Sequence, residues 1–187
     1  IPYARPPVGD LRWKAPQPPQ KRSAALKTTA FCEICPQYTD HDFNPATPQV
    51  IDGNEDCLYL NIWSPKNATG TLPVFFWIHG GGNSIQWPLL SRHDAGILAN
   101  KGNMVVVTVN YRLGLMGFFN HPALKTGDDA GDSGNFAILD LIAALKWVRA
   151  NIKNFGGNPG NVTVVGESAG ATNVFSLVVS PMAKGLF

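Results

Sequence analysis

The chain has 187 residues, of which 44% are hydrophobic and 15% are charged, and its formal net charge is +2. These proportions are typical of a globular protein and exclude a disordered, collagen-like or coiled-coil chain. Because Lys and Arg do not cluster and no run approaches about 18 apolar residues, we expect no nucleic-acid partner and no transmembrane segment.

The first third of the chain is rich in proline and is predicted to be mostly irregular. Residues 1–30 are Pro-rich and basic. We expect an extended covering segment there, because proline removes a backbone donor and disfavours the helical conformation of the residue before it. Residues 31–57 contain all three cysteines and are predicted to form a loop. The alternating residues 58–63 predict a strand.

Farther along, apolar runs alternate with helical patterns. The continuous apolar runs at residues 72–78 and 104–110 are typical of strands that are buried on both faces. Residues 89–101, between these runs, have helical character. The clearest helix covers residues 135–154, where apolar residues recur at every third or fourth position. This order predicts an α/β fold with a mixed, mostly parallel central sheet and flanking helices.

The most informative motif follows a short buried strand predicted at residues 161–165. It reads Gly166-Glu167-Ser168-Ala169-Gly170 and precedes a helix predicted from residue 169 to about 179. A Gly-x-Ser-x-Gly sequence between a strand and a helix is typical of a nucleophile elbow, in which glycine is needed because side chains at those positions would collide. The motif predicts Ser168 as a nucleophile near a helix N-terminus that favours negative charge. The alternative is a packing turn with an incidental serine.

A second glycine motif, His79-Gly80-Gly81-Gly82, directly follows the apolar run that ends at Ile78. Glycines let the backbone approach a ligand and turn its N–H groups toward it. Such a loop supplies oxyanion donors in lipases and esterases, together with the residue after the nucleophile, here Ala169. The alternative is a flexible loop. His79 belongs to this loop and precedes the nucleophile, so we interpret it as structural rather than as the catalytic base.

The rest of a catalytic triad does not follow Ser168 in this sequence. In hydrolases of this geometry the order is Ser, then Asp or Glu, then His, but residues 169–187 contain none of these three types. We therefore expect the acid and the general base to lie beyond Phe187, and we interpret the chain as a fragment that is inactive alone. A signal peptide would not be visible in a chain that starts at Ile1 without an initiator Met.

Together the motifs resemble the type-B carboxylesterase family, the group that includes cholinesterases and bacterial p-nitrobenzyl esterases. The resemblance runs nearly from end to end, and the string from Glu55 to Asn61 and the Ser168 motif are its most specific parts. It implies an α/β-hydrolase fold, with residues 1–187 as the N-terminal portion of a single longer domain, truncated after the nucleophile elbow. The matching segments are 1–4, 6–9, 55–61, 79–82, 110–114, 134–135, 155–157 and 166–170.

Roles for individual residues are carried over from this resemblance. Ser168 is implied as the nucleophile, and the backbone of Gly81, Gly82 and Ala169 as the oxyanion hole. Gly80 and Glu167 lie near the site, with Glu167 tuning local charge rather than serving as the triad acid. Two pairs of charged residues are implied as structural ion pairs that support the fold, namely Arg12 with Glu55 and Arg112 with Asp140.

The sequence also departs from the family pattern. Asn83 stands where the family often has an aromatic residue after the glycines, so the resemblance does not say which residue forms the wall of the acyl pocket. Ala137 and Leu141 interrupt the usual start of the long helix, and Asn158 replaces a common Asp.

The three cysteines allow two interpretations. A zinc site is disfavoured because three thiols without a spaced His do not make a closed four-ligand site. The family pattern implies a disulfide between Cys35 and Cys57, worth about 3–4 kcal/mol in the loop-entropy model, with Cys32 left over as a buried thiol or a competitor. A disulfide favours an oxidising compartment, so we expect a secreted or periplasmic protein.

Two further features bear on processing and substrate. Asn67-Ala68-Thr69 is a glycosylation sequon in a polar loop, which makes Asn67 a candidate site. Between Cys35 and Cys57 the aromatic residues are Tyr38 and Phe43. The absence of a tryptophan there disfavours a choline ester, whose quaternary ammonium cholinesterases bind through such a residue.

The sequence therefore predicts a serine hydrolase that cleaves a small carboxylic ester through an acyl-enzyme intermediate, with no cofactor or metal. One alternative is a catalytically inactive adhesion or scaffold protein of the same fold, which the intact Ser168 disfavours. Another is a different Gly-x-Ser-x-Gly hydrolase, such as a hormone-sensitive-lipase-type esterase or a peptidase. The string from Glu55 to Asn61 and the cysteine loop disfavour both. The oligomeric state and the acyl and alcohol preferences stay open.

Overall fold

A computed structural model of the chain describes residues 1–38, 50–66, 68, 71–86 and 92–187. Its centre is a four-stranded sheet in the order β3-β5-β4-β6. The strands are β3 (Leu60–Trp63), β4 (Leu72–Ile78), β5 (Val105–Val109) and β6 (Gly157–Gly166). β4 lies parallel to both β5 and β6, whereas β3 is antiparallel to β5. The mixed, mostly parallel sheet predicted from the sequence is therefore confirmed.

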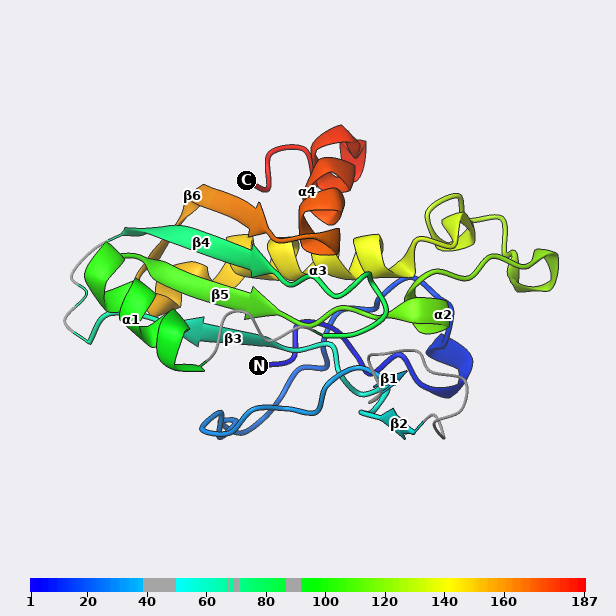
Figure 1. The fold of residues 1–187 in the computed structure, drawn as a ribbon, viewed down its shortest axis with the longest axis horizontal. Helices are drawn as coiled ribbons and strands as arrows, with labels where there is room; N and C mark the ends of the chain where they lie inside the picture. The colour runs from blue at the N-terminus through cyan, green and yellow to red at the C-terminus, as the bar shows by residue number, and fades with distance from the viewer. Residues whose placement is uncertain (39–49, 67, 69–70, 87–91) are drawn as a thin grey trace.

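Helices cover both faces of this sheet, with α1 in front and α3 behind in Figure 1. The helices are α1 (Arg92–Gly102), the short α2 (Gly114–Gly117), α3 (Phe136–Asn151) and α4 (Ala169–Val179). Short 3-10 turns occur at Gly9–Leu11, Pro122–Leu124, Gly131–Ser133, Ile152–Phe155 and Pro181–Ala183. Among the described residues, no helix is both long and apolar enough to cross a membrane.

The β-branched strand β5 shows how the two faces are filled. Val105, Val107 and Val109 belong to the main core, which also includes the apolar face of α3. Val106 points to the opposite face, where it packs with Ala95 and Ala99 of α1 in a smaller cluster. This alternation follows from the two-residue period of a strand.

The N-terminal segment runs along β3, as the expected covering segment would. The Ile1 ammonium donates to the Leu60 carbonyl at 2.8 Å, and the Leu60 N–H donates back to the Ile1 carbonyl at 2.9 Å. Tyr3 is buried, and its hydroxyl donates to the carbonyl of Asn110 just beyond β5 at 2.7 Å. The segment is thus tied into the sheet that carries the site.

Several expectations from the sequence need correction. The long helix ends at Asn151, and the chain continues as a 3-10 turn over Ile152–Phe155 that ends at Gly156, a residue in the left-handed conformation. The predicted loop at residues 31–57 contains two short antiparallel strands, β1 (Gln37–Tyr38) and β2 (Ile51–Asp52), on either side of residues that lie outside the described part. β6 begins earlier than expected, at Gly157.

The prediction that the strands are buried on both faces was wrong for two of them, β4 and β6. Phe75 and Trp77 of β4 are only half-buried, because α1 covers mainly β5 and β3 on that face. Thr163 of β6 is exposed, since β6 is an edge of the described sheet. Continuous apolar runs therefore mark β4 and β5 as strands but do not measure how fully each face is covered.

Candidate active site

The turn between β6 and α4 holds Ser168 in an unusual backbone conformation. Ser168 has φ +52° and ψ −121°, a region that residues with a Cβ rarely occupy. Its side chain is exposed, and its carbonyl accepts the N–H groups of Ala171 at 3.0 Å and Thr172 at 3.2 Å, which begin α4. The surrounding structure thus maintains a strained residue at the sharp point of the turn, a pattern that clusters at functional sites.

Close packing on both sides of this turn explains its glycines. A Cβ on Gly166 would collide with the backbone of Gly170 and Ala171. A Cβ on Gly170 would collide with the carbonyl oxygen of Ile78, the last residue of β4. The collisions expected from the sequence are therefore present, and they involve backbone atoms that cannot rotate away.

The glycine loop lies directly against the serine because the parallel strands end at one level. Ile78 of β4 aligns with Gly166 of β6, so the residues that follow each strand emerge side by side. A Cβ on Gly80 would lie 2.5 Å from a carboxylate oxygen of Glu167 and 3.0 Å from the Ser168 Cβ. The structure thus brings Gly80, Glu167 and Ser168 together, although nearly 90 residues separate the two segments.

Hydrogen bonds to carbonyl groups set the direction of the loop N–H groups. In a trans peptide the C=O and the following N–H point in opposite directions. The Gly80 carbonyl lies 2.8 Å from His79 Nδ1, which must donate, so the Gly81 N–H is held pointing away from His79. The Gly81 carbonyl accepts the N–H groups of Ser84 and Ile85, both at 3.0 Å, and this orients the Gly82 N–H.

The left-handed conformations of Gly81 and Gly82, at φ +98° and +63°, make this arrangement possible. By the same reasoning, the two bonds to the Ser168 carbonyl orient the Ala169 N–H. Within the described part of the chain, the N–H groups of Gly81, Gly82 and Ala169 have no hydrogen-bond acceptor. Three backbone donors of the described residues are thus unpaired, two on the glycine loop and one on the residue after Ser168.

His79 supports the loop and has no bond to the serine. Its ring stacks on Tyr111 with 4.4 Å between the ring centroids. Burial lowers the pKa of His79 to about 4, so the ring is neutral near pH 7. The Nδ1 bond to the Gly80 carbonyl assigns the proton to Nδ1, and Nε2 is buried with no partner among the described residues. These contacts agree with a structural interpretation of His79.

Comparison with known proteins gives matches over the whole chain. Residues 1–187 match the model of the carboxylesterase family. The chain belongs to the carboxylesterase family. It is 46% identical over 187 residues to the para-nitrobenzyl esterase of Bacillus subtilis (strain 168), and the alignment covers all of this chain and 37% of that protein. It is also 46% identical over 188 residues to the fumonisin B1 esterase of Sphingopyxis macrogoltabida, covering all of this chain and 34% of that protein.

Solved structures of family members have the same fold. A PNB esterase superimposes with a TM-score of 0.85 at 45% identity, over 100% of this chain and 37% of its own. The predicted α/β-hydrolase fold is therefore confirmed, and the chain corresponds to its N-terminal part. The chain spans about a third of the length of the curated relatives it matches.

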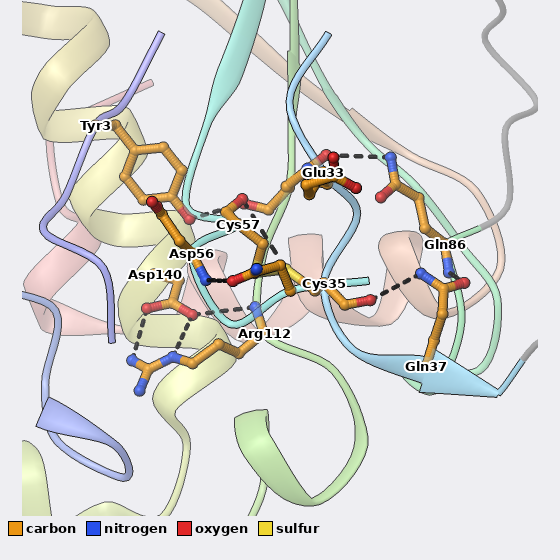
Figure 2. Close-up of a disulfide and its surroundings, with 11 residues drawn as sticks. Tyr3, Glu33, Cys35, Gln37, Asp56, Cys57, Gln86, Arg112 and Asp140 are labelled. Carbon is orange, nitrogen blue, oxygen red and sulfur yellow. Dashed lines mark hydrogen bonds and ion pairs between the residues drawn. A yellow bond between two sulfur atoms is a disulfide. The ribbon is translucent and has the colours of Figure 1, made fainter. Parts of the chain in front are cut away.

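The charged residues singled out in this carboxylesterase-family chain form two ion pairs (Figure 2 shows the buried one). Arg112 donates from Nε to Asp140 Oδ2 at 2.8 Å and from Nη2 to Oδ1 at 2.7 Å, and its backbone N–H also reaches Oδ2 at 3.1 Å. Their side chains are only 3% and 0% exposed. Arg12 and Glu55 make a similar two-bond pair, at 2.6 and 2.7 Å, with side chains 39% and 22% exposed.

The disulfide between Cys35 and Cys57 is present, with 5.0 Å between the two Cα atoms (Figure 2). Both cysteines are buried, and Cys32 is free and half-buried. Because two of the three thiols are joined, a zinc site built on the three cysteines is not possible. Phe43 and the sequon residue Asn67 lie outside the described residues.

One contact near the site was not expected from the sequence. Asn83 and Asn173 bond to each other through their side-chain amides, although they are 90 residues apart. In the sequence, Asn83 stands out only as a departure from the family pattern, and Asn173 carries no signal. No local pattern could have revealed the pair, because it depends on how the glycine loop and α4 pack.

Proposed function

We propose that Ser168 is the nucleophile of a serine hydrolase that cleaves carboxylic esters through an acyl-enzyme intermediate. The observation that carries this proposal is the strained, exposed Ser168 at the start of α4, with the glycine loop pressed against it. The family membership and the names of the relatives, two of which are esterases, support the same reaction class.

In the proposed reaction the Ser168 Oγ attacks the ester carbonyl carbon while a general base removes its proton. Negative charge then develops on the carbonyl oxygen, and the N–H groups of Gly81, Gly82 and Ala169 stabilise it. Each such donor typically contributes about 3–4 kcal/mol. The N-terminus of α4 adds a favourable electrostatic field. The alcohol leaves with the proton, and water then hydrolyses the acyl-serine ester to release the acid.

Glu167 and Gly80 shape the surroundings of this reaction without bonding to the ester. The Glu167 carboxylate faces the place that a Gly80 side chain would occupy. We assign Glu167 to tuning local charge and Gly80 to allowing close approach of the loop to Ser168.

The domain assignment is part of the proposal. Residues 1–187 form the N-terminal portion of a single α/β-hydrolase domain, and the triad acid and His come from chain beyond Phe187. Residues 169–187 hold no Asp, Glu or His, and the relatives are about three times longer, which supports this assignment. The substrate is a small carboxylic ester. The disulfide supports a secreted or periplasmic location, because such bonds persist in oxidising compartments.

Labelling with a fluorophosphonate probe tests the proposal on the full-length protein. We expect the probe to modify the wild type at Ser168, as located by peptide mass spectrometry, and not to modify Ser168→Ala. Ser176→Ala is the matched control, since Ser176 lies on the same helix and its hydroxyl donates to the Thr172 carbonyl. It should label like the wild type.

Two other outcomes would change the proposal. A folded full-length protein that is not labelled would favour the inactive adhesion or scaffold interpretation. Labelling of the isolated 187-residue chain would show that the general base lies within it and would overturn the domain assignment.

A further inference from the structure

The side chains of Asn83 and Asn173 form a reciprocal amide pair between the glycine loop and α4. Asn173 Nδ2 donates to Asn83 Oδ1 at 2.8 Å, and Asn83 Nδ2 donates to Asn173 Oδ1 at 3.3 Å. Asn173 is only 2% exposed and Asn83 is half-buried. In this pair each amide donates one hydrogen bond and accepts one, so removing either partner would leave the buried Asn173 side chain or its partner without that bond, which is costly.

The pair joins the two segments that carry the proposed oxyanion donors. Asn83 directly follows Gly82, and Asn173 lies one helical turn after Ala169 on α4. Along the chain, Asn83 is therefore within two residues of Gly81 and Gly82, and Asn173 is one helical turn from Ala169. A displacement of the loop relative to α4 would move the N–H groups of Gly81 and Gly82 relative to Ser168 and the Ala169 N–H.

Other contacts anchor the loop side of the pair. The Asn83 carbonyl accepts the Gly114 N–H at 2.7 Å. The Tyr111 hydroxyl donates to the His79 carbonyl at 2.7 Å and lies 3.2 Å from Asn83 Oδ1. Both ends of the glycine loop are thus attached to the segment after β5, and the amide pair links the loop to α4.

Asparagine suits position 83 for two separate reasons. Its backbone is left-handed, with φ +56°, a conformation that asparagine tolerates better than most residues. Its amide offers a donor and an acceptor together, which an aspartate cannot do. The same residue thus ends the loop and bonds it to α4.

We propose that Asn83 and Asn173 are positioning residues that hold the oxyanion donors of the glycine loop in register with Ser168. This inference rests on the proposed function. Neither side chain touches the reacting atoms. Because the oxyanion forms only on the way to the transition state, misplacing its donors lowers kcat more than it raises KM. A misplacement near 1 Å can cost about 100-fold in rate.

A double-mutant cycle on the full-length protein tests the pair. Asn83→Gly removes the amide and keeps the positive φ unstrained, and Asn173→Leu removes the other amide while filling its space. The measurements are kcat and KM for p-nitrophenyl acetate and the affinity for a trifluoromethyl ketone, whose serine adduct carries an oxyanion. Asn151→Leu is the control, since Asn151 is also half-buried and donates to a helix carbonyl, that of Trp147. It lies at the end of α3, before the start of β6, whereas Ser168 follows the end of β6.

We expect each variant to lower kcat by about 10- to 100-fold with little change in KM, and to lose affinity for the ketone by a similar factor. The double variant should be no worse than the poorer single variant, because both remove the same contact. The control should retain the wild-type kcat and ketone affinity, even if its melting temperature falls.

Other results would overturn the inference. Unchanged kcat in Asn83→Gly, with Ser168-dependent hydrolysis intact in the wild type, would refute the positioning role and leave the proposed function standing. The inference would also be refuted if the two losses in kcat multiplied in the double variant, or if KM alone rose. If Asn173→Leu does not fold, Asn83→Gly and its ketone affinity decide the question. A wild type without Ser168-dependent hydrolysis would overturn the proposed function and this inference together.

Discussion

Two regions of the molecule are held in place by different kinds of contact. Around Ser168 the close contacts are between backbone atoms, with glycines packed tightly on both sides of a strained serine. Around the Cys35–Cys57 disulfide it is made of buried side chains, including the Arg112–Asp140 pair. The residues that look reactive by charge are therefore those that hold the scaffold, whereas the proposed chemistry depends on residues with almost no side chain.

The largest effect that we predict is the loss of Ser168 reactivity when one methyl group is added to the turn around it. We expect Gly166→Ala to abolish fluorophosphonate labelling of Ser168 in the full-length protein, because the new Cβ would collide with the backbone of Gly170 and Ala171. Neither side of the collision is a movable side chain, so the turn itself must shift. Labelling rate and melting temperature are the two measurements.

Gly160→Ala on the same strand is the matched control. Among the described residues, a Cβ at Gly160 would meet the Asn158 side chain at 3.4 Å, an ordinary contact, and nothing closer. This variant should label at the wild-type rate. Equal labelling of the two variants would show that the turn has more room than its geometry indicates.

The second region is tested by removing a charge from each ion pair. Arg112→Met should cost about 3–5 kcal/mol of unfolding free energy, because it leaves the fully buried Asp140 carboxylate without its cation. Arg12→Met should cost much less, since the Arg12–Glu55 pair is open to water. Denaturant titration of the full-length protein compares them. Similar losses would mean that burial does not separate the two pairs as argued.

The sequence predicted much of the backbone region and less of the packing around it. The strand from Leu72 to Ile78 and the helix beginning at Ala169 were predicted with their observed bounds. Continuous apolar runs and a Gly-x-Ser-x-Gly turn are local signals, so one sequence carries them. The half-exposed faces of β4 and β6 could not be predicted, because coverage depends on which helices pack where.

The same limit applies to contacts between distant residues. The Cys35–Cys57 disulfide and the two ion pairs were expected only because the sequence resembles a family in which they recur. The Asn83–Asn173 pair has no such precedent in the motifs, and neither residue has a local pattern. Polar pairs that form only after the loop and helix pack are therefore the part of the candidate site that the sequence could not supply.

The last effect we predict comes from His79, whose titratable ring lies in the glycine loop. Burial lowers its folded-state pKa from 6.5 to about 4, so folding favours the neutral ring. This contribution to the free energy of unfolding is complete above pH 6.5 and is lost as the pH falls from 6.5 through 4. The loss amounts to about 2.5 kcal/mol by pH 4.5.

His79→Asn keeps a neutral donor toward the Gly80 carbonyl but does not titrate. Denaturant midpoints of the full-length protein at pH 7.5 and 4.5 should therefore differ less in His79→Asn than in the wild type. Parallel pH dependence in the two proteins would show that the ring is hydrated or paired in solution, and that even this part of the loop is less tightly enclosed than the disulfide region.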